Sequence, residues 1–303
     1  MKRRIVLGLA FACHAALLGT LSLVPHVAAS DLSEAALPST FSGHRDGALF
    51  DAYGRLTAYP NKIEVPCPTQ TARTAVVLVA GQSNAANYGN TAARSAHGGA
   101  VVNFFGGRCF IAQSPLLGAS GEWGDAWTSL GNKLVESGAF DAVVIVPAAI
   151  GGTAAQQWTQ EGRYHAVLDD TVAEAQRSYR FTQVIWFQGE TDYYAHTPPQ
   201  AYRAQLLDII GGLRNRGVTA PVYMTVATRC EAIAPDWRAS NEIAVVQKAL
   251  GSSGPAMRLG VDADRLLASR EDRHDNCHLS RSGVEKLSAA WLNVLQERQA
   301  ARD

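Results

Sequence analysis

The sequence has no net charge, because 27 Lys and Arg residues are matched by 27 Asp and Glu residues. Without a basic excess, the chain lacks the attraction for phosphates on which nucleic-acid binding depends, so we expect no nucleic-acid partner. It has no internal repeat and no low-complexity tract. After residue 29 it has no apolar run long enough to cross a bilayer. Its 303 residues, 47% of them hydrophobic, suffice for a sizeable globular core.

Cysteine is also scarce, with five residues and no CxxC pair. The wide spacing excludes a zinc knuckle, which needs paired ligands close in sequence. Four cysteines follow residue 29, and in an exported chain they allow two disulfides with three possible pairings. These residues are Cys67, Cys109, Cys230 and Cys277.

The first 29 residues have the pattern of a cleaved signal peptide. A basic start at Lys2, Arg3 and Arg4 precedes a mostly apolar run over residues 5–24, and small residues at 27–29 precede Ser30. The alternative is an uncleaved membrane anchor, which Pro25 disfavours. Cleavage leaves 24 basic and 27 acidic residues, a net charge of −3. We therefore expect an exported protein, periplasmic or secreted, with no stable membrane span.

Two regions follow the signal segment. Residues 30–73 lack periodicity and predict an extension packed on the main domain, with a short hairpin over residues 48–65. From residue 74 to 303, apolar runs alternate with helical patterns. The predicted strands are 76–80, 101–105, 142–147, 183–187, 222–227 and 258–261, and the predicted helices are 123–137, 164–179, 199–216, 237–250 and 282–299. This alternation predicts an α/β fold with a parallel sheet covered on both faces.

Polar motifs follow most of the predicted strands and would share the carboxyl edge of the sheet, where ligands bind. The first of these motifs places Ser83 just after a strand that is predicted to be buried. Serine is a good helix N-cap, which is one interpretation of Ser83. The other is a nucleophile, which needs a base to take its proton and an acid to orient that base.

Asp275 and His278 can supply both groups. An Asp three residues before a His can turn back in a tight loop and accept the proton on Nδ1, so that Nε2 faces the serine. Two alternatives remain at this point. His278 can be a solvated loop histidine, or the loop can bind a metal through Asp272, His274, Asp275, Cys277 and His278.

Acyl transfer also needs donors aimed at a developing oxyanion. Gly151 and Gly152 can expose backbone N–H groups, Gln188 can add a side-chain donor, and the N–H of Ser83 is a third. Glu190 is open to three interpretations: a second orienting carboxylate, a hydrogen-bond partner within the rim, or a charge at a helix start.

Together these motifs resemble the SGNH hydrolase superfamily, and most closely its sialate O-acetylesterase-like and acetylxylan-esterase-like branch. The matching residues are Gly81-Gln82-Ser83-Asn84, Ala149-Ile150-Gly151-Gly152-Thr153 with Trp158, Trp186 with Gln188-Gly189-Glu190 and Asp192, and Asp275 with His278. The resemblance begins at about residue 74 and extends to the C-terminus. The chain departs from the Gly-x-Ser-x-Gly elbow of α/β-hydrolases, because Ala85 replaces its second glycine.

The resemblance implies a three-layer α/β/α sandwich with a flavodoxin-like parallel sheet. It implies Ser83 as nucleophile, His278 as base and Asp275 as its orienting acid. Ser83, Gly151 or Gly152, and Gln188 would form the oxyanion hole, with Gln82, Asn84 and Glu190 in support. The family needs no metal, and we expect no cofactor.

The predicted function is removal of O-acetyl groups from a carbohydrate. Two alternatives stay open: a cell-envelope O-acetyltransferase that uses the same acetyl-enzyme, and a non-catalytic polysaccharide-binding protein. Residues near the rim loops can contact the sugar or belong to the core: Trp123, Trp127, Trp158, Tyr193, Tyr194 and Arg229.

If the catalytic assignment is right, the loops of Cys230 and Cys277 are neighbours. We then expect a disulfide between them, since a bridge needs Cα atoms within about 7 Å. Cys67 would pair with Cys109 by elimination. Free buried cysteines or another pairing are the competing interpretations.

Overall fold

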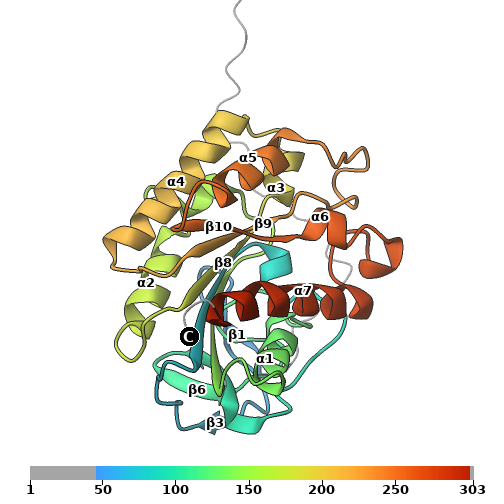
Figure 1. Cartoon of the computed structure of the whole chain (residues 1–303). Coiled ribbons are helices and arrows are strands. Elements are labelled where there is room, and N and C mark those ends of the chain that lie inside the picture. The colour runs from blue at the N-terminus through green and yellow to red at the C-terminus, as the bar shows by residue number, and fades with distance from the viewer. Residues whose placement is uncertain (1–45, 301–303) are drawn as a thin grey trace, which may run out of the picture. The chain divides into compact units, whose positions relative to one another are not determined.

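A computed structural model of the chain describes residues 46–300, so the predicted signal segment and the extension up to residue 45 lie outside the described residues. An eight-stranded sheet runs in the order β10-β9-β8-β4-β7-β5-β6-β3 (Figure 1). The first six are mutually parallel. They are β4 (Thr74–Gly81), β5 (Val101–Phe105), β7 (Ala142–Ala149), β8 (Gln183–Phe187), β9 (Val222–Val226) and β10 (Met257–Asp262). All six predicted strands are present.

Helices cover both faces of this sheet (Figure 1). Along β4 the side chains of Val76 and Leu78 pack in a core with α2 (His165–Ala175), α4 (Pro199–Asn215) and α5 (Glu242–Gly251). The alternate residues Val77 and Val79 pack in a second core with α1 (Trp127–Glu136) and α7 (Arg281–Ala300). Strand side chains point alternately to opposite faces, so one apolar strand serves both layers. The three-layer α/β/α architecture is confirmed.

Short helices complete the connections. The α-helices are α3 (Glu190–Tyr194) and α6 (Ala263–Leu266), and the 3-10 helices are η1 (Ser83–Ala85), η2 (Gly98–Ala100), η3 (Ala155–Trp158) and η4 (Arg270–Asp272). Among the residues 46–300, no helix has both the length and the apolar character needed to cross a membrane.

The expectation of a purely parallel sheet needs correction at one edge. Strand β6 (Arg108–Ile111) pairs antiparallel with β5, and β3 (Glu64–Val65) pairs antiparallel with β6. Gly106 and Gly107 connect β5 to β6 with φ values of +62° and +70°. Two residues with positive φ form the tight turn whose twist suits a hairpin, and glycine adopts that conformation without strain.

Residues 46–73 pack against this edge. Strands β1 (Leu49–Phe50) and β2 (Leu56–Ala58) form the expected antiparallel hairpin. Leu56 is fully buried in a small core with Phe110 and Leu117. The extension thus contributes both a strand and core residues to the fold around the sheet.

Candidate active site

The loop after β4 carries Ser83 at the carboxyl edge of the sheet. Strand β4 is buried throughout and ends at Gly81, whose φ is +136°. A Cβ atom there would lie 2.0 Å from the carbonyl oxygen of Phe187 in β8, so only glycine fits. The chain then enters η1 at Ser83 with Gln82 as the N-cap residue. The hydroxyl of Ser83 is therefore not used as a helix cap.

A tight loop before α7 brings Asp275 against His278. Nδ1 of His278 lies 2.7 Å from Oδ2 of Asp275, and Oδ1 of Asp275 accepts the backbone N–H groups of Cys277 and His278. Asn276 closes the loop with a φ of +66°, which asparagine tolerates. Burial opposes ionisation of Asp275, but its hydrogen bond to His278 and the charge of that ring outweigh burial and hold the pKa of Asp275 well below its usual value.

The other ring nitrogen of His278, Nε2, is buried and has no hydrogen-bond partner among the described residues. Buried polar atoms nearly always have a partner, so this nitrogen is open to a hydrogen bond from a group outside the described residues. Asn84, next to Ser83, donates from Nδ2 to the carbonyl oxygen of Cys277 at 3.3 Å. No direct hydrogen bond joins Ser83 to His278 in the described residues. The Asn84–Cys277 bond places the serine loop beside the histidine loop.

Buried hydrogen bonds of Asn84 and Arg273 support both loops. Asn84 Nδ2 also donates to Glu190 Oε1 at 2.9 Å, and Arg273 donates to the carbonyl oxygen of Cys277. Burial raises the pKa of Glu190 to about 7, although the Asn84 bond and the charge of Arg273 oppose the rise. Glu190 is thus a hydrogen-bond partner within the rim and the first residue of α3, not an orienting group for His278. The role of Arg273 was not predicted, although it lies in the same motif as Asp275.

Tyr88 is a second residue that the sequence analysis missed. Its ring stacks on His278 with centroids 5.2 Å apart. Ser120 donates from Oγ to the Tyr88 hydroxyl at 3.4 Å and accepts the N–H of Gly151 at 2.8 Å. The only sequence signal was the position of Tyr88, five residues after Ser83 in the same motif.

The two glycines of the loop after β7 differ in what they offer. The N–H of Gly151 is engaged by Ser120, so Gly151 does not supply a donor in this structure. Gly152 is exposed, has a φ of +72°, and would leave open space around a Cβ atom. Among the described residues neither the N–H of Gly152 nor that of Ser83 donates a hydrogen bond. Both N–H groups thus have no acceptor within the described residues, as a donor to a ligand requires.

The expected donor role of Gln188 conflicts with its surroundings. Gln188 is fully buried, and its Nε2 donates to Asp192 and to the carbonyl oxygen of Thr153 at 3.1 Å. Its Oε1 accepts from Tyr202 at 3.1 Å. Asp192 in turn accepts the N–H of Ala155 at 2.8 Å. The Gln188 amide therefore braces the loops after β7 and β8 and has no donor directed at a substrate.

The predicted sugar contacts differ in how open they are to a ligand. Trp158 is 0% exposed and donates from Nε1 to Thr153, so no face is open to a ligand. Arg229 is engaged by Glu231 and by two backbone carbonyl oxygens. The Tyr193 hydroxyl accepts the N–H of Arg238 at 3.2 Å. Trp127 is buried in the core, whereas Trp123 and Tyr194 are exposed.

Both expected disulfides are present, Cys230–Cys277 and Cys67–Cys109. The first ties the loop after β9 to the residue directly before His278. Next to it, the N–H of Glu231 donates to the carbonyl oxygen of Asn276 at 2.9 Å. The loop of Asp275 and His278 is therefore held covalently as well as by hydrogen bonds.

Three possible metal-ligand groups also meet in this loop. Ligand atoms of His274, Asp275 and His278 lie within 4.8 Å of one another. Asp275 and His278 already satisfy each other, and His274 Nε2 lies 3.2 Å from the carbonyl oxygen of Tyr88. A metal would have to replace these bonds, so the geometry favours a His–Asp pair.

Comparisons with known proteins agree with this geometry. The family model of the carbohydrate esterase, sialic acid-specific acetylesterase, matches residues 73–295. A solved structure from Arabidopsis thaliana is similar at a TM-score of 0.58 and 18% identity, over 76% of this chain and 98% of the other. The crystal structure of NanS is similar at a TM-score of 0.50 and 16% identity, over 78% of this chain and 100% of the other.

A carbohydrate acetylesterase from Xanthomonas citri is similar at a TM-score of 0.50 and 16% identity, over 76% of this chain and 57% of that one. At these identities the structures show a shared fold. No curated protein sequence matches the chain. The family match, by contrast, covers well over half of the chain and includes every motif discussed above. The chain therefore belongs to the carbohydrate esterase, sialic acid-specific acetylesterase family, and it is a carbohydrate O-acetylesterase.

Proposed function

We propose that this protein is an exported serine esterase that removes O-acetyl groups from a carbohydrate through Ser83, His278 and Asp275. One observation carries the assignment. Asp275 holds Nδ1 of His278 at 2.7 Å, while Nε2 is buried without a partner beside the loop of Ser83. A base that is fixed at one nitrogen and vacant at the other suits a serine nucleophile.

In the proposed reaction, Ser83 Oγ attacks the acetyl carbonyl carbon while His278 Nε2 takes the hydroxyl proton. The resulting imidazolium is stabilised by Asp275. Collapse of the tetrahedral intermediate releases the sugar as an alcohol, which takes the proton back from His278. Water then attacks the acetyl-enzyme with His278 as base, releasing acetate and restoring Ser83.

The backbone N–H groups of Ser83 and Gly152 are the proposed oxyanion donors. Both lie on loops at the carboxyl edge of the sheet, and neither is engaged within the described residues. Gln188 acts in this proposal as a positioning residue, because its bonds to Thr153 and Asp192 hold the loop that carries Gly152. Donors of this kind act mainly on the transition state.

Export is proposed on two grounds. The N-terminal sequence has the pattern of a signal peptide, and the described part of the chain contains two disulfides. Disulfides persist in oxidising compartments and are rare where thiols are kept reduced. Expression of the full chain followed by mass spectrometry of the secreted protein tests the proposed export. We expect the secreted protein to lack the first 29 residues.

The catalytic assignment is tested by acetate release from a panel of acetylated polysaccharides. We expect Ser83→Ala and His278→Ala each to abolish acetate release. In a well-studied serine hydrolase, loss of either corresponding residue lowers turnover by about a millionfold. Asp275→Ala should cost less, because water can partly orient His278. Ser178→Ala, at an exposed serine away from the site, is the matched control. A Ser83→Ala protein with a tenth of the wild-type activity contradicts the mechanism. Adding a deacetylated oligosaccharide as acceptor tests the alternative acetyltransferase function, because a transferase would acetylate this oligosaccharide.

A further inference from the structure

The loop that carries Asp275 and His278 also carries a second histidine, His274. The N–H of His274 donates to the carbonyl oxygen of His278 at 2.9 Å, and the flanking residues Arg273 and Leu279 pair antiparallel. Residues opposite each other in an antiparallel pair carry their side chains on the same face. The backbone of this loop therefore brings two imidazole rings together, with centroids 6.1 Å apart and planes inclined by 31°.

Asp275 lies within reach of both rings. Its Oδ2 is 2.7 Å from Nδ1 of His278 and 4.0 Å from Nε2 of His274. Ligand atoms of the three side chains lie within 4.8 Å of one another. Zn²⁺ binds imidazole nitrogen and carboxylate oxygen at about 2.0–2.2 Å, so shifts of about 1 Å bring all three atoms onto one ion. The loop thus offers two nitrogen ligands and one oxygen ligand to zinc.

The charges around the loop both favour and oppose a metal ion. Asp275 is ionised, because its pKa is held well below its usual value, and the imidazoles can supply neutral nitrogen ligands. The positive charge of Arg273, next to His274, opposes a cation. The carboxyl groups of Glu190 and Asp264 act on that guanidinium in the opposite sense. We therefore expect zinc to bind here more weakly than at a structural zinc site.

The loop is both fixed and open to solvent. The disulfide between Cys230 and Cys277 holds it directly before His278, and Oδ1 of Asp275 accepts the N–H groups of Cys277 and His278. Ligands that are already held in place lose less conformational freedom when an ion binds. The side chains of His274 and Asp275 are 24% and 41% exposed, so an ion can reach them from solvent.

A metal ion on Nδ1 changes what His278 can do. In the proposed mechanism Asp275 holds the proton of Nδ1, and Nε2 takes the hydroxyl proton of Ser83. A metal ion on Nδ1 uses the lone pair of that nitrogen, so the one proton of the neutral ring moves through solvent to Nε2. Nε2 is then a donor and cannot accept the serine proton. The carboxylate of Asp275 is also withdrawn from the ring.

We propose that His274, Asp275 and His278 form an inhibitory Zn²⁺ site that holds the proposed catalytic base in the wrong tautomer. The inference rests on the proposed function, because the inhibition follows from the role of His278 as base. Without zinc, the Asp275–His278 hydrogen bond is kept. His274 acts in this proposal only as a metal ligand.

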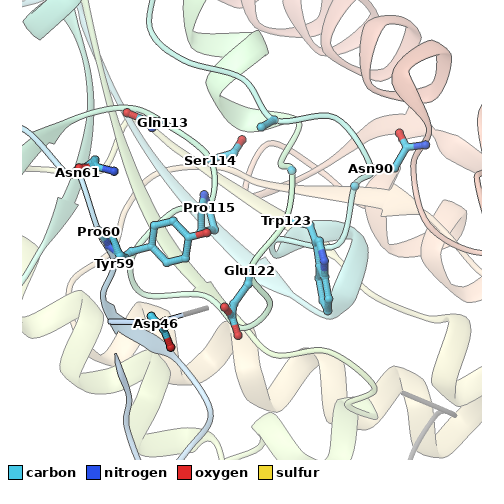
Figure 2. A pocket seen from close by; sticks show the side chains of 13 residues that line it. Asp46, Tyr59, Pro60, Asn61, Asn90, Gln113, Ser114, Pro115, Glu122 and Trp123 are labelled. Atoms are coloured by element: carbon cyan, nitrogen blue, oxygen red, sulfur yellow. The ribbon is translucent and has the colours of Figure 1, made fainter. Parts of the chain in front are cut away.

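A neighbouring cavity of about 370 Å³ is a competing place for a cation (Figure 2). Asn90 lines it and donates its backbone N–H to the carbonyl oxygen of Leu279, the residue after His278. The described lining contains the carboxyl groups of Asp46 and Glu122 but no His or Cys. Zn²⁺ sites in proteins are built mainly from imidazole and thiolate ligands, so the loop is the better site.

The first test titrates Zn²⁺ against hydrolysis of an aryl acetate. Zinc should lower kcat without raising KM, because the ion binds Nδ1, away from Nε2 and Ser83, and EDTA should restore activity. Mg²⁺ prefers oxygen ligands and should not inhibit. His274→Gln keeps an N–H donor for the carbonyl oxygen of Tyr88 but lacks the imidazole. It should raise the half-inhibiting zinc concentration by about tenfold or more.

Two variants are matched controls. His165→Gln removes a histidine that lies 2.9 Å from Asp169, a His–Asp pair outside the three-ligand group. Asp46→Asn removes a carboxylate from the cavity. Both should keep the wild-type response to zinc, and hydrolysis without added metal shows that each variant is folded. A tenfold loss of sensitivity in either control, or an unchanged response in His274→Gln, overturns the site.

Calorimetry gives a second readout that does not depend on turnover. Zn²⁺ should bind Ser83→Ala as tightly as wild type and His274→Gln about tenfold more weakly or worse. Equal binding by His274→Gln and wild type overturns the site. Binding that depends on His274 but leaves hydrolysis unchanged refutes the inhibition and, with it, the role of His278 as base. Failure of the metal site and failure of the proposed function are thus distinguished.

Discussion

The ring of Tyr88 lies on the imidazole of His278 with their planes inclined by 26°. The Tyr88 hydroxyl also closes over Gly151, where a Cβ atom would lie 2.6 Å from it. One side chain thus contacts the proposed catalytic base and the glycine loop. It restricts rotation of the imidazole on the side that Asp275 does not hold.

Tyr88→Leu should therefore lower kcat by about tenfold, because an imidazole free to tilt spends less time in the productive geometry. Tyr88→Phe keeps the ring and should lose much less. Steady-state kinetics on an aryl acetate measures both. Equal losses in the two variants would show that the hydroxyl, through Ser120 and Gly151, carries the effect.

Glu190 should make stability depend on pH. Burial raises its pKa from 4.5 to about 7, so in that window the folded protein keeps a proton that the unfolded chain has released. The free energy of unfolding contributed by Glu190 is therefore full below pH 4.5 and falls as pH rises to about 7. Glu190→Gln retains an oxygen for Asn84 and removes this loss, which is roughly 3 kcal/mol. Urea denaturation at several pH values measures it, and a pH-independent difference from wild type contradicts it.

Gln188→Ala should destabilise the fold. Removing the amide leaves Asp192, Thr153 and Tyr202 with lost partners in a fully buried site, at a cost of about 1–3 kcal/mol for an unsatisfied group. Thermal denaturation and kinetics on the same samples separate the possible roles. A loss of about 10²–10³ in kcat with unchanged stability would restore Gln188 as an oxyanion donor.

The disulfide next to His278 should affect turnover. Both sulfur-bearing residues are buried, at 2% and 3% exposure, so replacement is a cleaner test than reduction. Cys230→Ala with Cys277→Ala should lower kcat and also remove about 4 kcal/mol of stability, as expected for a loop of this length. Cys67→Ala with Cys109→Ala is the matched control, which should lose stability with a smaller change in kcat. Equal kcat values for the two double variants would mean that the first disulfide does not hold the catalytic loop.

Much of the architecture was readable from local patterns. The apolar run at 76–80 predicts a strand buried on both faces, and β4 is one. Because parallel strands place their carboxyl ends on one edge, the motifs at Ser83 and His278 were expected to meet without any knowledge of their contacts. The Asp275–His278 bond followed similarly, since three-residue spacing allows a loop to close on itself.

What the sequence did not reveal depends on contacts between distant segments. A glutamine at a strand end can point to a substrate or to its neighbours, and for Gln188 the choice depends on Asp192 and Thr153. The sequence likewise allowed two roles for Trp158, stacking on a sugar or filling the core. The β5–β6 hairpin did have a local signal, Gly106-Gly107, which was overlooked. The packing of Leu56 in the extension against Phe110 and Leu117 also joins distant segments, and no local pattern encodes it.

The carboxyl edge of the sheet also has a consequence for biosynthesis. Ser83 follows β4, the first of the parallel strands along the chain, whereas His278 follows β10, the last. The base can reach the nucleophile only after the intervening strands have paired, because β8 and β9 separate β4 from β10 in the sheet. On the proposed mechanism, a chain still emerging during synthesis, or held unfolded for the proposed export, therefore cannot cleave esters. On that mechanism, hydrolytic activity begins only after the C-terminal segment has folded onto a completed sheet.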